Sequence, residues 1–270
     1  IEKQGDASSF SLVVPMQAQG SKTPLFCVHA VGGYSLAYMD LAKAISTEQP
    51  FYAIESLGLR EGQRAQINVI EMASTYIEQI KATQAEGPYR LMGHSFGGLV
   101  AYEMTRQLLE QGEQVSHLTL IDTLTPDYQL QDGKPEKINY QEINKPLQQA
   151  MSQDLPISEE DFNVMSLDEQ IETILDLFRQ MPTDIDIKII EQVLDVNRKN
   201  LTAGQTYQLH ALSQAVPVKL YRAKQRPEKL NQIDAGWKRV LNDDLTVVEV
   251  DGDHLTMLDE KNVGQWIDDV

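Results

Sequence analysis

The sequence feature that most constrains the fold is a G-x-S-x-G pattern at Gly93–Gly97, with Ser95 at its centre. An apolar run, Tyr89–Met92, precedes it, and apolar residues at helical spacing follow it from Leu99 onward. This order predicts a strand, a sharp turn and a helix. Such a turn strains the backbone of its central residue, needs small neighbours and lifts the central hydroxyl clear of the sheet edge. Ser95 is therefore a candidate nucleophile, although a glycine-rich turn with an ordinary serine accounts for the motif taken alone equally well.

Strand-like and helix-like patterns alternate along the chain around this motif. Strands separated by helices need right-handed crossovers, so we expect an α/β fold with a mostly parallel sheet and helices on both faces. Apolar runs predict strands over 25–28, 51–54, 89–92, 117–121, 216–221 and 245–250, with an edge strand over 10–14 closed by Pro15. Apolar residues at helical spacing predict helices over 36–45, 69–80, 99–108, 166–181, 187–201 and 263–270.

The alternation breaks over about 124–200, between two predicted sheet strands. Ser166 to Glu169 form a capping box that opens a helix, and the apolar face of that helix is expected to pack against neighbouring helices rather than line a substrate tunnel. Residues 125–200 hold 16 Asp and Glu against 7 Lys and Arg, which is more than half of the net charge of −17. We therefore expect an inserted, solvated helical lid that covers the site and sets its specificity.

Charge and composition exclude several classes of function. A net charge of −17 argues against nucleic acid or anionic membrane as a partner, because both require clustered Lys and Arg. The chain has no apolar run long enough to span a membrane and no secretion signal, and its single cysteine, Cys27, permits no internal disulfide, so we expect a cytoplasmic location. No linker divides residues 1–270, which predicts one domain, and the absence of an initial Met suggests excision from a longer protein.

A serine nucleophile needs a base, usually a histidine, and in doubly wound sheets reactive groups gather at the C-terminal ends of the strands. His254 alone follows the last predicted strand directly. His117 stands at a strand start and His210 closes a long helix, while His94 lies inside the turn, where its side chain would point away from Ser95. His29 ends its strand at the correct edge, but it precedes the serine and its loop has another role. His254 is therefore the predicted base.

The base needs an acid to orient it, and Asp122 ends the strand that follows the elbow helix. One helix and one strand separate it from Ser95, so the two residues are expected on neighbouring strand ends. The alternative for Asp122 is a turn or helix cap, a position that Asp favours. Asp251 and Asp253 are rival acids, but both are too close to His254 in sequence to face its ring easily. The order Ser95, Asp122, His254 matches that of elbow-type hydrolases.

An oxyanion hole needs two backbone N–H groups directed at the developing charge. Phe96, directly after the nucleophile, would supply one at a helix N-terminus. The loop after Leu25–Val28 would supply the other, from Val31, because Gly32 and Gly33 allow that loop to approach closely. The sequence carries no metal-ligand constellation and no phosphate-binding loop, so the chemistry that we expect is cofactor-free acyl transfer.

Four segments in order carry a resemblance to a known family: Pro24–Gly33, Pro88–Gly98, Leu120–Asp122 and Gly252–Leu258. They resemble the type I thioesterase domains that end nonribosomal peptide synthetases and polyketide synthases, and the resemblance covers almost the whole chain except the lid. It implies an α/β-hydrolase fold and an acyl-Ser95 intermediate. The acyl or peptidyl chain would come from the phosphopantetheine arm of an upstream carrier domain and leave by hydrolysis or macrocyclisation.

Two other functions fit the same residues. A stand-alone editing (type II) thioesterase or a small-ester hydrolase would share the same three side chains, and turnover of carrier-bound long acyl chains against simple esters separates them from a release domain. A noncatalytic hydrolase-like binding module usually lacks one member of the set, whereas Ser95, Asp122 and His254 are all present.

Overall fold

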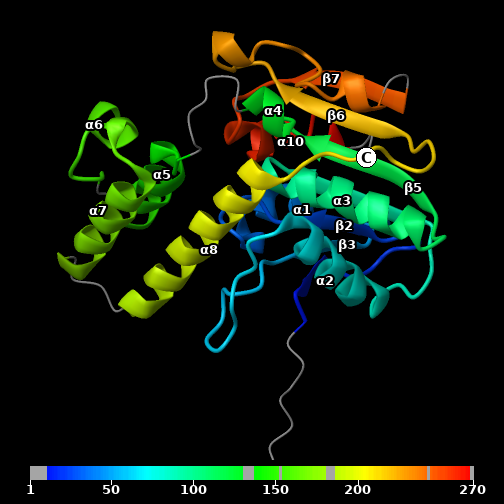
Figure 1. Cartoon of the computed structure of the whole chain (residues 1–270), viewed down its shortest axis with the longest axis horizontal. Helices are drawn as coiled ribbons and strands as arrows, with labels where there is room; N and C mark the ends of the chain where they lie inside the picture. The colour runs from blue at the N-terminus through cyan, green and yellow to red at the C-terminus, as the bar shows by residue number, and fades with distance from the viewer. Residues whose placement is uncertain (1–10, 130–136, 152–153, 181–185, 242–243, 268–270) are drawn as a thin grey trace, which may run out of the picture.

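A seven-stranded, mostly parallel sheet forms the centre of the molecule (Figure 1). The computed structural model describes residues 11–129, 137–151, 154–180, 186–241 and 244–267. The strand order is β1-β3-β2-β4-β5-β6-β7, and β1 runs antiparallel to β3 while the other neighbours are parallel. The predicted α/β fold is confirmed. The strands are β1 (Val13–Gln17), β2 (Leu25–Val28), β3 (Phe51–Ile54), β4 (Tyr89–His94), β5 (Val115–Ile121), β6 (Val218–Ala223) and β7 (Leu245–Val250).

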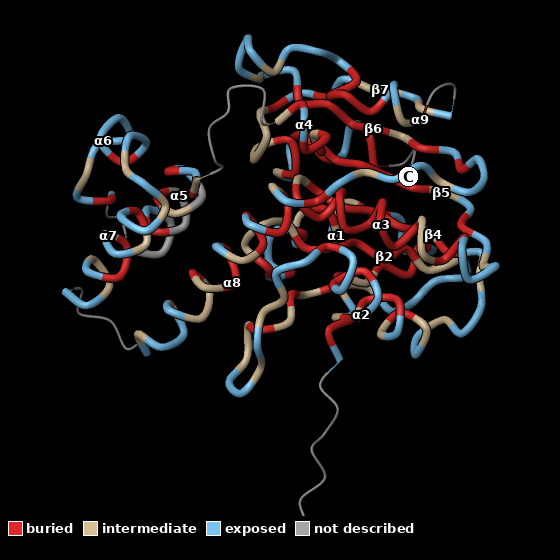
Figure 2. The backbone as a smooth tube through the Cα atoms, in the orientation of Figure 1, coloured by how far each residue is buried: buried red, intermediate tan, exposed pale blue. Residues whose placement is uncertain are grey.

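Helices cover both faces of the sheet. Successive residues of a strand point to opposite faces, so Phe26 packs in one cluster with α2 and α3, and its neighbour Leu25 packs in a second cluster with α1 and α10. Figure 2 shows the buried residues concentrated in the sheet and in α3. The helices of this part are α1 (Met39–Ala44), α2 (Val69–Lys81), α3 (Phe96–Glu110), α9 (Lys238–Leu241) and α10 (Glu260–Val263), with short 3-10 turns at Ser35–Tyr38, Glu228–Leu230 and Thr256–Leu258.

Helix α2 illustrates how the pattern sets the packing. The side chain of Asn68 caps it by accepting a hydrogen bond from the N–H of Ile70 (2.8 Å), as expected for an N-cap residue. All six residues of the apolar stripe that predicts this helix are buried against the sheet: Val69, Met72, Ala73, Tyr76, Ile77 and Ile80.

The inserted helical segment lies between β5 and β6, and we call residues 124–206 the lid. Its helices α5, α6 and α7 extend to one side of the sheet, and α8 connects them to it (Figure 1). The capping box is confirmed, since Ser166 donates its N–H to Glu169 (2.7 Å) and accepts the N–H of Glu169 (3.3 Å). The lid helices are α4 (Pro126–Gln129), α5 (Tyr140–Met151), α6 (Glu159–Val164), α7 (Leu167–Gln180) and α8 (Ile187–Thr206).

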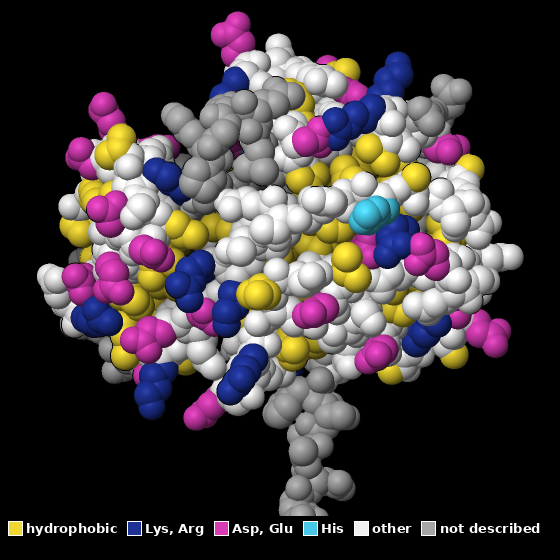
Figure 3. Space-filling model, in the orientation of Figure 1, with side chains coloured by type: hydrophobic (Ala, Val, Ile, Leu, Met, Phe, Trp, Pro, Cys, Tyr) yellow, Lys and Arg dark blue, Asp and Glu magenta, His cyan; other side chains and the backbone are white. Residues whose placement is uncertain are grey.

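The lid has a small hydrophobic cluster of its own, in which Phe162 is fully buried. The expectation that the apolar face of α7 packs within the lid is confirmed, because Ile174 and Leu175 are buried in this cluster and Ile171 and Phe178 pack against it. Figure 3 shows Asp and Glu side chains spread over the lid side of the molecule, together with Lys and Arg.

Several boundaries differ from the prediction. Strand β1 does not close at Pro15 but continues through it to Gln17, which an edge strand with a bulge permits. The stripe predicted from Leu36 is only partly buried, since Leu36 is 69% exposed and the helical segment is split into a 3-10 turn and α1. Helix α8 ends at Thr206, so His210 lies beyond it. Phe10, Met181 and Val270, which the predicted patterns included, lie outside the described residues.

No helix within the described ranges is both long and apolar enough to cross a bilayer.

Candidate active site

The turn between β4 and α3 holds Ser95 in a strained conformation. Its φ is 56° and its ψ is −126°, in the left-handed half of the map that L-residues rarely adopt. A Cβ at Gly93 would lie 2.2 Å from the carbonyl oxygen of Gly97, and one at Gly97 would lie 2.4 Å from that of His29. Both positions of the motif therefore require glycine. The strain and the two glycines confirm the sharp strand-to-helix turn that the motif predicts.

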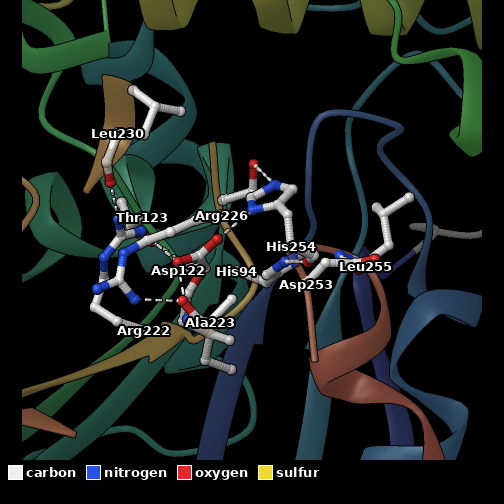
Figure 4. A network of polar contacts seen from close by, with 12 residues as sticks. His94, Asp122, Thr123, Arg222, Ala223, Arg226, Leu230, Asp253, His254 and Leu255 are labelled. Carbon is white, nitrogen blue, oxygen red and sulfur yellow. Dashed lines mark hydrogen bonds and ion pairs between the residues drawn. The ribbon is translucent and has the colours of Figure 1, made fainter. Parts of the chain in front are cut away.

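Ser95, His254 and Asp122 meet at the C-terminal edge of the sheet. Oγ of Ser95 lies 3.0 Å from Nε2 of His254, and Nδ1 of His254 lies 2.7 Å from Oδ2 of Asp122 (Figure 4 labels His254 and Asp122). A carboxylate can only accept, so Nδ1 carries the proton and Nε2 is left to accept the serine hydroxyl. Asp122 directly follows β5, and His254 follows β7. The structure thus brings together the three residues that the sequence selects.

A buried arginine holds the other side of the Asp122 carboxylate. Oδ1 forms an ion pair with the guanidinium of Arg222, which is 1% exposed, and accepts the N–H of Ala223 at 3.2 Å (Figure 4). Burial alone raises the pKa of the Asp122 carboxyl, but the hydrogen bond and charge of His254, followed by Arg222 and Ala223, bring this pKa down to about 2. Asp122 is thus a carboxylate at neutral pH, although it is almost fully buried.

The rival acids are occupied elsewhere. Asp251 forms an exposed ion pair with Lys224 at 2.6 Å. Asp253 accepts the N–H groups of Leu255 (3.0 Å) and Thr256 (2.7 Å) and so caps the turn that carries the histidine. Asp122 is the carboxylate that accepts the hydrogen bond from Nδ1 of His254.

His94 supports the backbone of His254. Its Nε2 donates to the carbonyl oxygen of His254 (2.9 Å), and the two rings lie 4.8 Å apart (Figure 4). Burial, with a smaller contribution from the charge of His254, lowers the pKa of His94 to about 3. A neutral, buried His94 therefore holds the loop of His254 in place.

His29 has a structural place in the β2 loop. Its Nδ1 donates to the carbonyl oxygen of Ala30 (2.7 Å), which leaves Nε2 to accept the hydroxyl of Tyr76 (2.7 Å). Burial lowers the pKa of His29 to about 4. The neutral ring of His29 therefore supports the loop that contains Val31 through these two hydrogen bonds.

A cavity of about 560 Å³ opens over Ser95. Val31 and Phe96, the two predicted oxyanion-hole residues, both line it, and so does His254. The lid contributes a polar wall, and the apolar face of α7 does not contribute to it. The lid residues that line this cavity include Lys137, Asn139, Gln141, Glu159, Leu201 and Gly204.

The model of the thioesterase domain family matches residues 23–270. The chain belongs to this family. Among the described residues of this thioesterase domain, no group of three or more His, Cys, Asp and Glu side chains is placed to hold a metal ion.

The relatives of this thioesterase domain are large synthetases. It is 28% identical to atromentin synthetase greA from Suillus grevillei over 98% of this chain and 28% of that protein. It matches a four-domain nonribosomal peptide synthetase, solved bound to AMP and glycine, with 29% identity and a TM-score of 0.79 over 96% of this chain and 20% of the other. The NocB thioesterase domain, solved as a covalent complex with a fluorophosphonate nocardicin G analogue, matches with 25% identity and a TM-score of 0.65 over 95% and 96% of the two chains.

These comparisons confirm the predicted resemblance and fold. The thioesterase domain has the α/β-hydrolase fold, and its family and fold are those of hydrolases. Its matches span between 2% and 28% of the length of eight curated synthetases to which it is similar.

Two polar residues beside the site were not predicted from the sequence. Arg222 is the last residue but one of β6, and a charged residue near the C-terminal end of a sheet strand, where reactive groups gather, was a usable signal. Asn200 lies on α8 and donates to the carbonyl oxygen of Val31 (2.9 Å). No local pattern distinguishes it from Asn197, the other asparagine of that helix.

Proposed function

We propose that this thioesterase domain releases an acyl or peptidyl chain from a carrier-bound thioester, with Ser95 as the nucleophile. One observation carries the proposal: the continuous hydrogen-bonded series from Ser95 through His254 to Asp122, at 3.0 and 2.7 Å, at the mouth of a cavity. A serine hydroxyl is a weak nucleophile at neutral pH, and this arrangement supplies both the base and the group that orients it.

In the first half of the proposed reaction, Nε2 of His254 takes the proton of the Ser95 hydroxyl as Oγ attacks the thioester carbonyl carbon. The N–H groups of Val31 and Phe96 stabilise the resulting oxyanion, and Asp122 stabilises the imidazolium. The carbon–sulfur bond then breaks, and the thiolate leaves as a thiol with the proton from His254. An acyl-Ser95 ester remains in the cavity.

In the second half, His254 deprotonates either water or a hydroxyl or amine of the bound chain itself, and this nucleophile attacks the acyl-Ser95 carbonyl. Water gives the free acid, and an internal nucleophile gives a ring; in both cases the proton returns to Ser95 Oγ. The phosphopantetheine arm belongs to the carrier domain and enters as part of the substrate, so the proposed reaction uses no cofactor bound by this chain. The family and the synthetase relatives support an upstream carrier domain as the partner.

The test is to load acyl and peptidyl thioesters of a carrier domain and to measure intact mass. We expect an acyl adduct on the wild-type chain and none on Ser95→Ala, and product masses then separate hydrolysis from loss of water through ring closure. An adduct retained on Ser95→Ala would refute the assignment. Faster turnover of simple esters than of carrier-bound chains would instead favour a stand-alone editing thioesterase or ester hydrolase.

A further inference from the structure

The loop from His29 to Gly33 is pinned at both ends. The N–H of His29 donates to the carbonyl oxygen of Ile54 (3.0 Å), and the N–H of Ser56 donates to that of Gly33 (2.7 Å). Between them, the carbonyl oxygen of Ala30 accepts both the N–H of Gly33 (3.0 Å) and Nδ1 of His29. A trans peptide directs its N–H and its C=O in opposite directions. Fixing the Ala30 carbonyl therefore fixes the direction of the Val31 N–H.

The next peptide unit is held from the lid. The carbonyl oxygen of Val31 accepts a hydrogen bond from Nδ2 of Asn200 (2.9 Å), which lies 169 residues later on α8 and is fully buried. A carbonyl oxygen only accepts, so the amide atom that faces it is the nitrogen. The two peptide units that flank Val31 are thus set by His29 on one side and by Asn200 on the other.

The second amide atom of Asn200 gives this contact its weight. Its Oδ1 is buried and has no hydrogen-bond partner among the described residues. An unpartnered buried acceptor costs free energy that an apolar side chain of similar size would avoid. Packing alone therefore does not explain an asparagine here, whereas the hydrogen bond from Nδ2 to the loop does.

Helix α8 also contacts the other side of the proposed oxyanion hole. A Cβ at Gly204 would lie 3.2 Å from the ring of Phe96, so this helix packs closely on the residue that follows the nucleophile. Just beyond the helix, Tyr207 donates its hydroxyl to the buried carboxylate of Glu103 on α3 (2.8 Å), which anchors this end of α8 to the core. One lid helix thus contacts both residues whose N–H groups would face the oxyanion.

We propose that Asn200 is a positioning residue for oxyanion stabilisation. Its amide holds the carbonyl group of Val31, so that the N–H of the same residue stays directed at the developing charge. The direction of this N–H therefore depends on the position of α8. The inference rests on the proposed function and adds a specific consequence: removing the Asn200 amide slows acylation while leaving ground-state binding of the ester unchanged.

The test measures the pre-steady-state burst of nitrophenolate from p-nitrophenyl acetate and the affinity of phenylboronic acid, whose tetrahedral adduct on serine places an oxygen at the oxyanion position. In Asn200→Leu we expect the acylation rate constant to fall roughly tenfold, below the ~10²–10³-fold loss for a deleted oxyanion donor. Phenylboronic acid should bind weaker by a similar factor, and the ester concentration that gives half-saturation should stay within about threefold.

Asn200→Asp keeps the shape of the side chain but lacks the N–H donor at neutral pH, so it should show the same loss if the leucine variant does not fold. Asn197→Leu is the matched control, because Asn197 lies one turn earlier on α8 and is also buried with an unpartnered Oδ1, yet no hydrogen bond joins it to residues 29–33 in the described structure. It should acylate within about twofold of wild type.

A wild-type acylation rate in both Asn200 variants would overturn the inference. It would also be overturned by a decrease in rate no larger than that of Asn197→Leu, or by a change in the half-saturating ester concentration alone. These outcomes differ from failure of the proposed function itself. That failure would appear as a nitrophenolate burst that persists in Ser95→Ala.

Discussion

The sheet and the lid of this thioesterase domain differ in how they are held together. The sheet buries side chains on both faces under helices, whereas the lid encloses one smaller cluster around Phe162 and touches the core mainly through α8. Ser95, Asp122 and His254 all come from strand ends of the sheet, and the lid supplies a polar wall of the cavity. The comparison teaches that the reacting groups are placed by the larger core of the molecule, and we expect the lid, which has a separate cluster, to open locally.

The largest expected effect concerns the core alone. Asp122→Ala should lower the acylation rate by roughly 10⁴-fold, which is less than the loss in Ser95→Ala, because the histidine loses its orienting group. It should also destabilise the fold by roughly 3–5 kcal/mol, since it leaves Arg222 buried without its carboxylate. Rate and stability would be measured by burst kinetics and urea unfolding.

The double variant Asp122→Ala/Arg222→Met is the control, and it should recover stability but not rate. If the single variant were fully active, Asp251 would replace Asp122 as the candidate acid.

The second prediction separates the lid from the sheet. Phe162→Ala removes the ring at the centre of the lid cluster. Phe162 is 0% exposed, and the centroid of its ring lies 5.7 Å from that of Tyr140. The cost of such a truncation, roughly 3–5 kcal/mol, should appear as faster amide exchange in α5, α6 and α7, with β4 and β5 still protected. Equal loss of protection in the sheet would show that lid and sheet unfold as one unit.

The third prediction is that acid destabilises the sheet before it destabilises the lid. His29 and His94 have pKa values of about 4 and 3 in the folded chain, below the ordinary 6.5, and the lid contains no histidine. At pH values between 6.5 and these folded pKa values, the unfolded chain binds more protons than the folded chain. The free energy of unfolding is therefore highest above pH 6.5 and falls as the pH drops below 6.5. Between pH 6.5 and 5 each ring should cost roughly 2 kcal/mol.

Urea unfolding at several pH values would measure this slope, and His94→Gln should flatten it. Amide exchange at pH 5, corrected for the intrinsic rate, should increase in the sheet before it increases in the lid. A pH-independent midpoint in the wild-type chain would contradict neutral, buried histidines.

The smallest effect is expected at the surface of the core. Asp251→Asn removes only an exposed ion pair with Lys224, and pairs of this kind contribute little. Acylation should stay within about twofold of wild type in the burst assay. A large loss would mean that Asp251, and not Asp122, orients His254, and that the contact between Asp122 and His254 is structural.

The sequence predicted the sheet and the reacting groups better than the lid, for physical reasons. Gly93 and Gly97 mark the elbow because no side chain fits there. Asp122 stands out because it directly follows β5, and His254 because it lies four residues after the end of β7. Their catalytic roles remain predictions that the geometry supports. Helices α5 and α6 were missed because their buried residues, which include Tyr140, Leu147 and Phe162, pack in a cluster with α7 and α8 that exists only once the lid has folded.

The supporting contacts were beyond local patterns. Arg222 and Asn200 act on residues 100 and 169 positions away, and such pairings exist only once the chain is folded. The burial of the segment from Leu36 was overestimated. Leu36 lies in a 3-10 turn and Met39 begins α1, and both are exposed although they fit the helical period. Periodicity predicts that a helix forms, whereas the start of the helix decides which residues it buries.

Helix α8 runs without interruption for 20 residues, which corresponds to roughly 30 Å at 1.5 Å per residue. A tilt of its first residues would therefore also move its last turns, next to the active site. In chimeras that exchange lids between synthetases, the C-terminal junction should therefore lie before Ile187. The recipient then keeps its own α8 and the contact of Asn200 with the loop of Val31.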